Sequence, residues 1–426
     1  MITPIFWITQ DGEKLTIRIR APHANLKELD YDHSQQMFIF SCQPYFLRLN
    51  FKQMVDEYGS GRGQQIQYDT DKCEFLIYVQ KMHKNEHFED LDMISELLRA
   101  PETPKHARDL VEEIGEYLEE EDQGDGEEYL EKQDNIRDLT EEIEKSQEKG
   151  NGYGFGWTKY GIIERLRDEI GRVVDLEYPE DLGIGERARE CGQLDEEAFD
   201  AGRYLVDTIQ PEDVLNQIIT SDFRGKLEIT DEDREKLKEI RKIIDFSKLD
   251  NISIANSLID IIYAYLYDAR VNEWDDEPSC ESGWTCSKLS PSLAYFVKWN
   301  NVEEAVKGVI RRALTYPLYR SWQLSQKVVD DLKIVFRSGK SAILHVLCEI
   351  HRCFIASGEF KYLLNDLFIT DYIVWIQSEK INKVLEDLKE ELESLEVKKF
   401  EDLELLEIEA KLQMTQVLDS DDDEDS

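Results

Sequence analysis

The sequence lacks any strongly basic stretch. Its 426 residues carry 92 acidic and 51 basic side chains, so the formal net charge is −41 at pH 7. A nucleic-acid-binding protein needs Lys and Arg to neutralise phosphates, and this composition predicts repulsion from RNA, DNA and anionic membranes. Basic protein surfaces are the expected partners. Many such surfaces hold nucleic acid, and an acidic protein that covers one can act as a temporary substitute for it.

Long apolar runs are also missing. No stretch of about 18 apolar residues occurs, so the sequence predicts no membrane span. The first residues, MITPIFWITQDGEK, lack a basic segment followed by a long apolar one, so we expect no secretory signal. The seven cysteines are scattered and odd in number, which favours a reducing compartment over a disulfide framework. Cytosol and nucleus both satisfy these observations.

The usual motifs of catalysis are incomplete. Ser338-Gly339-Lys340-Ser341 ends like a phosphate-binding loop, but Ile334 stands where that loop needs its first glycine. We therefore interpret the segment as a helix junction. No nucleophile-elbow or zincin motif is present, and no acid–base pair can be singled out among 92 acidic residues. We expect no cofactor and no enzymatic activity, while an enzyme in the helical region is kept as a further alternative.

Four side chains suggest a metal cluster at first sight: His345, Cys348, His351 and Cys353. Structural zinc needs four converging ligands, and helical spacing brings only the first two of these together. A free cysteine on an apolar helix face is commonly a small core residue. The sequence therefore predicts no metal site.

Residues 1 to about 90 carry the pattern of β-strands. Leu15, Ile17 and Ile19 alternate with polar residues, which is the period of a half-buried strand. The same alternation recurs over 45–51, and short apolar runs occupy 37–40 and 75–79. Short strands separated by turn residues are typical of a sandwich. We expect an antiparallel β-sandwich over residues 1–95.

The next segment changes composition. From Glu112 to Glu148 the chain is dense in Glu and Asp and poor in apolar residues. Like charges repel, and little apolar surface is available for burial. We predict an acidic flexible linker over residues 96–150. Within 153–157 the sequence YGFGW is interpreted as a docking segment that leads into the following domain, because no strand precedes it as a dinucleotide fingerprint requires.

The remainder has helical spacing. Ile254, Leu258 and Ile261 lie on one helix face. A short heptad stripe from Ile381 to Leu395 predicts a long C-terminal helix that packs either within the chain or against a second copy. We expect an all-helical domain over 151–416 and an acidic disordered tail over 417–426. The predicted fold class is multidomain, β followed by α.

Specific segments then resemble a known family. The start MITPIF with ITQD, followed by PYFLRL at 44–49 and FEDLD at 88–92, is similar to the CS domain of the Shq family. The helical half is similar independently, through YGFG at 153–156, SLIDI at 257–261, KLSPSL at 288–293, RRALTYPLYR at 311–320, GKSAIL at 339–344 and LNDLFITDYIVWIQ at 363–377. The resemblance covers both halves in order. It implies an α-crystallin-like CS sandwich followed by a family-specific helical domain.

The resemblance also implies a function. Shq proteins are assembly chaperones of H/ACA ribonucleoproteins and are not enzymes. They bind the dyskerin-type pseudouridine synthase before RNA, occupy its RNA-binding surface and prevent aggregation or premature RNA binding. Release involves the pontin and reptin ATPases, and the particles serve rRNA pseudouridylation and telomerase RNA stability. The implied location is the nucleoplasm and the cytoplasm, without direct contact to nucleic acid or membrane.

The candidate interface residues come from the helical half. Aromatic residues are common interface anchors, and acidic residues complement a basic partner. The predicted dyskerin-binding set is Tyr316, Leu318, Tyr319, Arg320, Asp366, Asp371, Tyr372 and Trp375. Two alternatives stay open: the aromatic residues are core residues at helical spacing, and the two aspartates are helix caps.

Two further candidates lie near the ends of the chain. Phe6 and Gln10 flank the first strand and form a candidate protein-binding surface, unless Phe6 fills the sandwich core. Ser420 and Ser426 lie in the acidic tail and are possible phosphorylation sites, where a phosphate would add negative charge. The tail either steers the protein towards basic surfaces or merely solubilises it.

Two other binding functions compete with this interpretation. A CS-domain co-chaperone of the heat-shock machinery would bind its chaperone through residues 1–95 alone. An acidic histone chaperone would bind histones and be indifferent to dyskerin. Either function is compatible with the charge.

Overall fold

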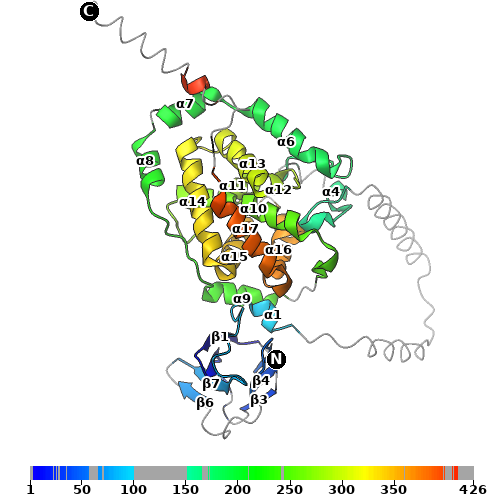
Figure 1. Ribbon diagram of the computed structural model, residues 1–426, viewed down its shortest axis with the longest axis vertical. Helices are drawn as coiled ribbons and strands as arrows, with labels where there is room; N and C mark the ends of the chain where they lie inside the picture. Colours follow the sequence, from blue (N-terminus) through cyan, green and yellow to red (C-terminus); the bar gives the residue numbers. More distant parts are fainter. Residues whose placement is uncertain are drawn as a thin grey trace, which may run out of the picture. The chain divides into compact units, whose positions relative to one another are not determined.

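The computed structural model describes residues 3–22, 24, 26, 29–34, 36–56, 66–69, 72–99, 151–165, 171, 173–209, 211–240, 244–358, 360–396, 398, 405 and 407–410 (Figure 1). The chain forms two compact units. The first comprises Met1–Glu141 and Ile229–Ile243, and the second comprises Glu142–Glu228 and Ile244–Ser426. The tail predicted over 417–426 and most of the linker predicted over 96–150 lie outside the described residues.

The first unit contains two antiparallel sheets. One has the strand order β1-β2-β7-β6 and the other the order β3-β4-β5. The strands are β1 (Ile5–Gln10), β2 (Lys14–Arg20), β3 (Asp30–Ser34), β4 (Met37–Cys42), β5 (Tyr45–Asn50), β6 (Ile66–Asp69) and β7 (Glu74–Gln80). Antiparallel N-terminal sheets followed by a mostly helical region confirm the predicted fold class.

The predicted alternation in β2 is borne out residue by residue. Leu15, Ile17 and Ile19 have no solvent exposure, while the residues between them are partly exposed. The two sheets meet through these inward faces, and the rings of Phe40 in β4 and Phe75 in β7 lie 5.1 Å apart in an edge-on arrangement. The described part of this unit also contains the helices α1 (Ile94–Leu97) and α9 (Asp231–Glu239), which pack against one another.

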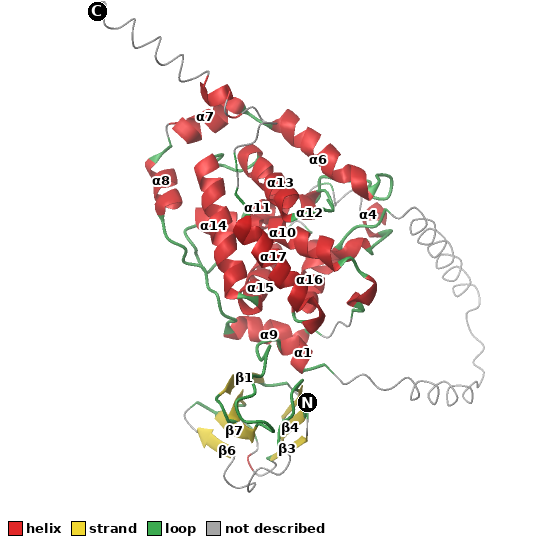
Figure 2. Ribbon diagram, viewed as in Figure 1, coloured by secondary structure: helices red, strands yellow, loops and turns green. Residues whose placement is uncertain are grey.

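The described part of the second unit consists of helices and loops (Figure 2). Its α-helices are α4 (Ile162–Arg165), α6 (Ile184–Ala198), α7 (Ala201–Ile209), α8 (Asp213–Thr220), α10 (Asn251–Val271), α11 (Ser282–Leu289), α12 (Pro291–Ala294), α13 (Val302–Thr315), α14 (Trp322–Ser338), α15 (Lys340–Ala356), α16 (Thr370–Ile376) and α17 (Asn382–Ser394). Shorter turns are η3 (Phe155–Trp157), η4 (Phe246–Lys248), the π-helical η5 (Asn365–Ile369) and η6 (Glu379–Ile381).

Helix α10 is the centre of this unit. It packs against α11, α12, α13, α14, α15 and α17, and most of its 21 residues are buried. A helix that is apolar on nearly every side must be surrounded by others. Leu385, Leu388 and Leu392 of the heptad stripe are buried in α17, which contacts α10, α13 and α14. The stripe therefore packs within the chain.

The structure also bears on the membrane question. Among the residues that the structure describes, none of the helices combines the length and apolar character needed to cross a bilayer.

Candidate functional site

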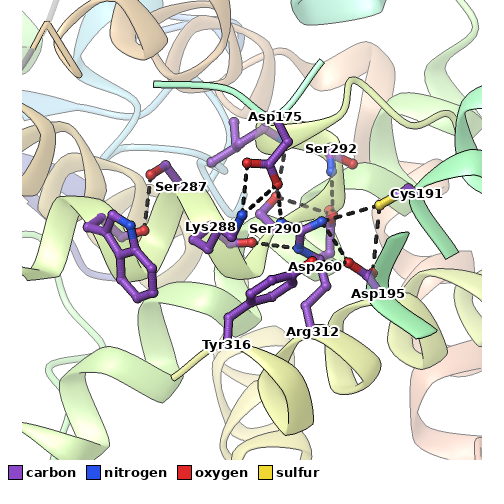
Figure 3. A network of polar contacts seen from close by, with 12 residues as sticks. Asp175, Cys191, Asp195, Asp260, Ser287, Lys288, Ser290, Ser292, Arg312 and Tyr316 are labelled. Atoms are coloured by element: carbon purple, nitrogen blue, oxygen red, sulfur yellow. Dashed lines mark hydrogen bonds and ion pairs between the residues drawn. The ribbon is translucent and has the colours of Figure 1, made fainter. Parts of the chain in front are cut away.

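The segment 311–320 supplies both a buried network and an exposed loop. Arg312 lies on the inward face of α13 and is only 1% exposed. Its Nη1 lies 3.1 Å from Asp195 Oδ1, and its Nη2 lies 2.5 Å from Asp175 Oδ2. Its Nε donates to the carbonyl of Lys288 at 2.6 Å. One guanidinium thus joins α13, α6, α11 and the loop that carries Asp175 (Figure 3).

Tyr316 closes the network on one side. Its hydroxyl donates to Asp195 Oδ1 at 2.8 Å. The Lys288 ammonium and the Arg312 guanidinium lie 4.2 Å and 4.6 Å from the centre of its ring, distances at which cations are attracted to an aromatic face. Lys288 also bonds both carboxylate oxygens of Asp175, at 2.9 and 3.0 Å. Each charge of the network therefore has a partner of opposite sign.

The network shifts the pKa values of its two aspartates in opposite directions. Burial raises the pKa of Asp195, although Arg312 opposes the shift. Burial also acts to raise the pKa of Asp175, but Arg312 and Lys288 together outweigh it and leave that pKa below its ordinary value. Burial raises the pKa of the Cys191 thiol to about 12. Cys191 is therefore protonated at neutral pH, which makes it a poor nucleophile and metal ligand.

A cleft of about 410 Å³ opens beside this network, lined by Asp175, Leu194, Glu197, Ala198, Lys288, Arg312 and Tyr316. Its two cations are already held by carboxylates of the chain. The carboxylates and the cations of the network neutralise one another, and the pair between Arg312 and Asp195 holds α6 against α13. We call this arrangement the clamp between the helices. Removing one of its charged groups would leave a buried charge without a partner, which is strongly destabilising.

A second buried carboxylate belongs to the SLIDI segment. Asp260 has no solvent exposure, and its Oδ2 accepts hydrogen bonds from Ser292 N at 2.8 Å and Ser290 Oγ at 3.1 Å. Ser290 caps α12, and Pro291 follows at the first helical position. Burial raises the pKa of Asp260 to about 7, against the opposing hydrogen bonds. Asp260 of the SLIDI segment thus binds the start of α12, which the KLSPSL segment forms.

The loop after α13 projects one apolar residue into solvent. Leu318 is 65% exposed. Hydrogen bonds fix the backbone of the two residues that follow it. Tyr267 donates its hydroxyl to the carbonyl of Tyr319 at 2.5 Å, and Arg320 N donates to Asp207 at 2.7 Å. Leu318 is therefore presented on a fixed backbone.

The second predicted stretch lies mostly in the core. Tyr372 and Trp375 are 2% and 0% exposed, which matches the core alternative for both. Tyr372 donates to the carbonyl of Ile254 at 3.1 Å, and Trp375 donates to Asn251 Oδ1 at 2.9 Å. The ring of Phe155 packs edge-on against both, at 4.9 and 6.4 Å. The YGFG segment docks here.

The capping alternative for the two aspartates is wrong. The helix α16 continues directly from η5, and its N-terminal flanking residue is Ile369. Asp371 is buried in the first turn of α16 and pairs with Lys159 at 2.9 Å. Asp366 lies in the first turn of η5 and is exposed. The structure thus separates the eight predicted residues, with Leu318 and Asp366 at the surface, Tyr316, Tyr319 and Arg320 half-buried, and Asp371, Tyr372 and Trp375 buried. Their role in partner binding stays a prediction.

The two candidates of the first strand serve the sandwich. Phe6 is 2% exposed and fills the core, as the alternative stated. Gln10 Nε2 donates to the carbonyl of Phe88 at 2.7 Å, and its Oε1 accepts from Phe88 N and Lys81 Nζ, each at 2.9 Å. Ser420 and Ser426 lie outside the described residues.

The sequence arguments missed the buried clamp. Arg312 follows Val309 by three residues and precedes Tyr316 by four, so all three lie on one helix face. A charged residue on an otherwise apolar helix face was the available signal. The acidic partners could not be identified in the same way, because Asp175 and Asp195 lie more than one hundred residues from Arg312 in the sequence.

Comparisons with known proteins cover both units. A family model described as "SHQ1-like, CS domain" matches residues 3–98, and one described as "SHQ1 protein, Shq1 domain" matches residues 218–405. The chain is 52% identical to a Protein SHQ1 homolog of Caenorhabditis elegans over 100% of both chains. It is 35% identical to that of Mus musculus, over 98% of this chain and 76% of the relative, and 28% identical to Protein shq1 of Schizosaccharomyces pombe, over 100% and 99%.

Proposed function

The chain belongs to the SHQ1 family, and we propose from this membership that it is a non-enzymatic assembly chaperone of H/ACA ribonucleoproteins. In this proposal it binds the dyskerin-type pseudouridine synthase before RNA arrives. It covers the RNA-binding surface of the synthase and prevents aggregation and premature RNA binding. The observation that carries the proposal is the similarity to SHQ1 proteins along the whole chain.

The charge supports the placeholder mechanism. An RNA-binding surface is basic, and a protein with a net charge of −41 meets it with a complementary potential. Such complementarity raises the association rate and excludes competing anions. Both RNA and this protein would then contest the same surface.

The loop around Leu318 is the contact that we favour. Its side chain is largely exposed, although its neighbours Tyr319 and Arg320 are held by Tyr267 and Asp207. An apolar anchor on a pre-formed backbone loses little conformational entropy on binding. Arg320 Nε also donates to the carbonyl of Pro317, which adds a further hydrogen bond within the loop. Release by the pontin and reptin ATPases, and residence in nucleoplasm and cytoplasm, complete the proposal.

The test measures binding of the full chain to the synthase of its own organism across a salt series, with and without H/ACA guide RNA. We expect binding that weakens with salt and that guide RNA competes away. Binding unaffected by RNA would contradict the placeholder mechanism. Parallel measurements with a heat-shock chaperone and with histones test the two other functions. A co-chaperone would bind the heat-shock chaperone through residues 1–95 alone, and a histone chaperone would bind histones and ignore the synthase.

A further inference from the structure

Helix α9 comes from the middle of the chain but belongs to the first unit. Residues 229–243 pack with the N-terminal sandwich, although the family model of the Shq1 domain begins at residue 218. The helix has strong start signals of its own. Thr230 and Asp233 form a reciprocal capping box, acidic residues fill the first turn, and Lys236 and Lys238 lie in the last. These signals fix where the helix begins and ends, while a helix of nine residues still depends on its contacts for stability.

The first contacts of α9 are with strand β1 (Figure 1). Trp7 Nε1 donates to Asp231 Oδ1 at 3.2 Å. Three residues further on, Arg234 donates to the carbonyl of Phe6 at 3.2 Å and to Asp92 Oδ1 at 3.0 Å. The Trp7 ring has the Arg18 guanidinium 4.1 Å from its centre and that of Arg234 at 5.9 Å.

The contacts continue at the same spacing. Leu237 has no solvent exposure, and its carbonyl accepts a hydrogen bond from Ser95 Oγ at 2.8 Å. Positions 231, 234 and 237 are three residues apart, so they share one helix face. This face covers β1, which is an edge strand of its sheet. Covering an edge strand with a helix prevents it from pairing with another chain.

The bonding between α9 and the sandwich is mainly polar. Leu237 is the one apolar side chain of α9 that is buried among its described residues, and Asp92 remains 42% exposed. Partly exposed ion pairs contribute little net stability and weaken with salt. The contacts of α9 with the sandwich therefore require particular side chains at positions 231, 234 and 237, and they contribute only modest stability.

We propose that Trp7, the Phe6 carbonyl, Asp92 and Ser95 form a helix-docking surface. It recognises a helix with the pattern Asp-x-x-Arg-x-x-Leu, and α9 occupies it in the free protein. A partner protein that presents a helix of this pattern competes with α9 for the same surface. Because α9 is tethered, its effective concentration is high, on the order of millimolar. Binding of such a partner is held back until α9 leaves.

The first test asks whether α9 can leave while the sandwich stays folded. Arg234→Glu in the full chain replaces the bond to Asp92 with repulsion. Hydrogen exchange should become at least about tenfold faster in α9 while β2 and β7 stay protected. Arg337→Glu is the matched control, because it breaks the Arg337–Glu393 pair on the second unit. Unchanged protection of α9, or simultaneous loss of protection in β2 and β7, would overturn the proposal.

The second test adds a helix in trans. A fluorescent peptide of residues 228–240 is titrated into the wild-type chain and into Arg234→Glu. We expect at least about tenfold tighter binding to the variant, whose surface is vacated, than to the wild-type chain, where tethered α9 competes. A peptide carrying Glu in place of Arg234 should bind neither. Equal binding of the peptide to both chains would show that α9 does not occupy its site.

Discussion

Arg312 Nη1 and Asp195 Oδ1 form an ion pair at 3.1 Å in the interior of the helical unit, and both side chains are almost completely buried. Asp195 also accepts the Tyr316 hydroxyl, so one carboxylate binds two residues of the RRALTYPLYR segment. This motif is thus divided between a buried clamp and the exposed loop of Leu318. The division allows the two parts to be tested separately.

The clamp predicts a large loss of stability in Arg312→Met. The change leaves Asp195 and Asp175 without their shared cation in a buried site, which should cost about 3–5 kcal/mol in the free energy of unfolding. Urea unfolding followed by circular dichroism measures it. Arg337→Met is the control, because that arginine is largely exposed, its partner Glu393 is partly exposed and little change is expected. Equal effects of both changes would contradict the clamp.

The loop predicts an effect on binding without an effect on folding. Leu318→Ala should weaken binding to the dyskerin-type synthase by roughly tenfold, in line with the loss of an interface anchor, and leave the unfolding midpoint unchanged. Leu314→Ala is the matched control. Leu314 is fully buried four residues earlier, so its truncation should cost about 2–5 kcal/mol of stability. Unaltered affinity in Leu318→Ala would remove this loop from the interface.

Asp260 predicts a pH dependence of stability. Burial raises its pKa to about 7, whereas an unfolded aspartate titrates near about 3.9. The folded state therefore retains the proton to higher pH, and the stability contributed by this group falls as pH rises from about 4 to about 7. Asp260→Asn keeps an acceptor for Ser292 and removes the titration.

The measurement for Asp260 is a set of urea unfolding curves across pH. The free energy of unfolding of Asp260→Asn relative to the wild-type chain should increase from about pH 5 to about pH 8. A difference that is constant across this range would show that Asp260 does not titrate there.

The YGFG segment predicts a strict requirement for glycine. Gly154 has φ of +71°, and an added Cβ would lie 2.9 Å from the carbonyl oxygen of Leu367. Gly154→Ala should therefore cost about 1–3 kcal/mol of stability. Gly185→Ala is the control, because nothing lies within 4 Å of its added Cβ in α6 and alanine favours a helix. Thermal unfolding of both variants measures the difference. A melting temperature of Gly154→Ala equal to that of the wild-type chain would refute the requirement.

The acidic tail predicts an effect on rate. Deletion of residues 419–426 removes six acidic side chains and should slow association with the synthase at low salt, because long-range attraction raises the association rate. The difference should vanish at high salt. Stopped-flow binding at two salt concentrations measures it, and identical low-salt rates would leave the tail a solubilising segment.

The placement of α9 shows where sequence reasoning ended. Its start signals, Thr230 and Asp233, are visible in the sequence. Its partners are not, because Trp7 and Asp92 lie more than one hundred residues away. Helical spacing assigned α9 to the helical domain, whereas its polar face packs with the sandwich. Periodicity states which face is polar and says nothing about which distant polar groups meet it.

The aromatic residues of the second predicted stretch show the same limit. Tyr372 and Trp375 have the spacing of one helix face, which suits a core and an interface equally. Their burial against Phe155 was decided by contacts across more than two hundred residues of sequence. Spacing within one helix carries no information about such contacts.

The sequence by itself determined the β-then-α order of the fold, the acidic character and the resemblance to the Shq family, because alternation, helical period, charge and motif order are local properties. The tertiary structure alone decided that Arg312 is buried among carboxylates, that Leu318 is exposed and that α9 covers β1. These depend on which distant segments come together, and burial then sets the pKa of Asp260 and Asp195 by removing water from charges whose neighbours only the fold supplies.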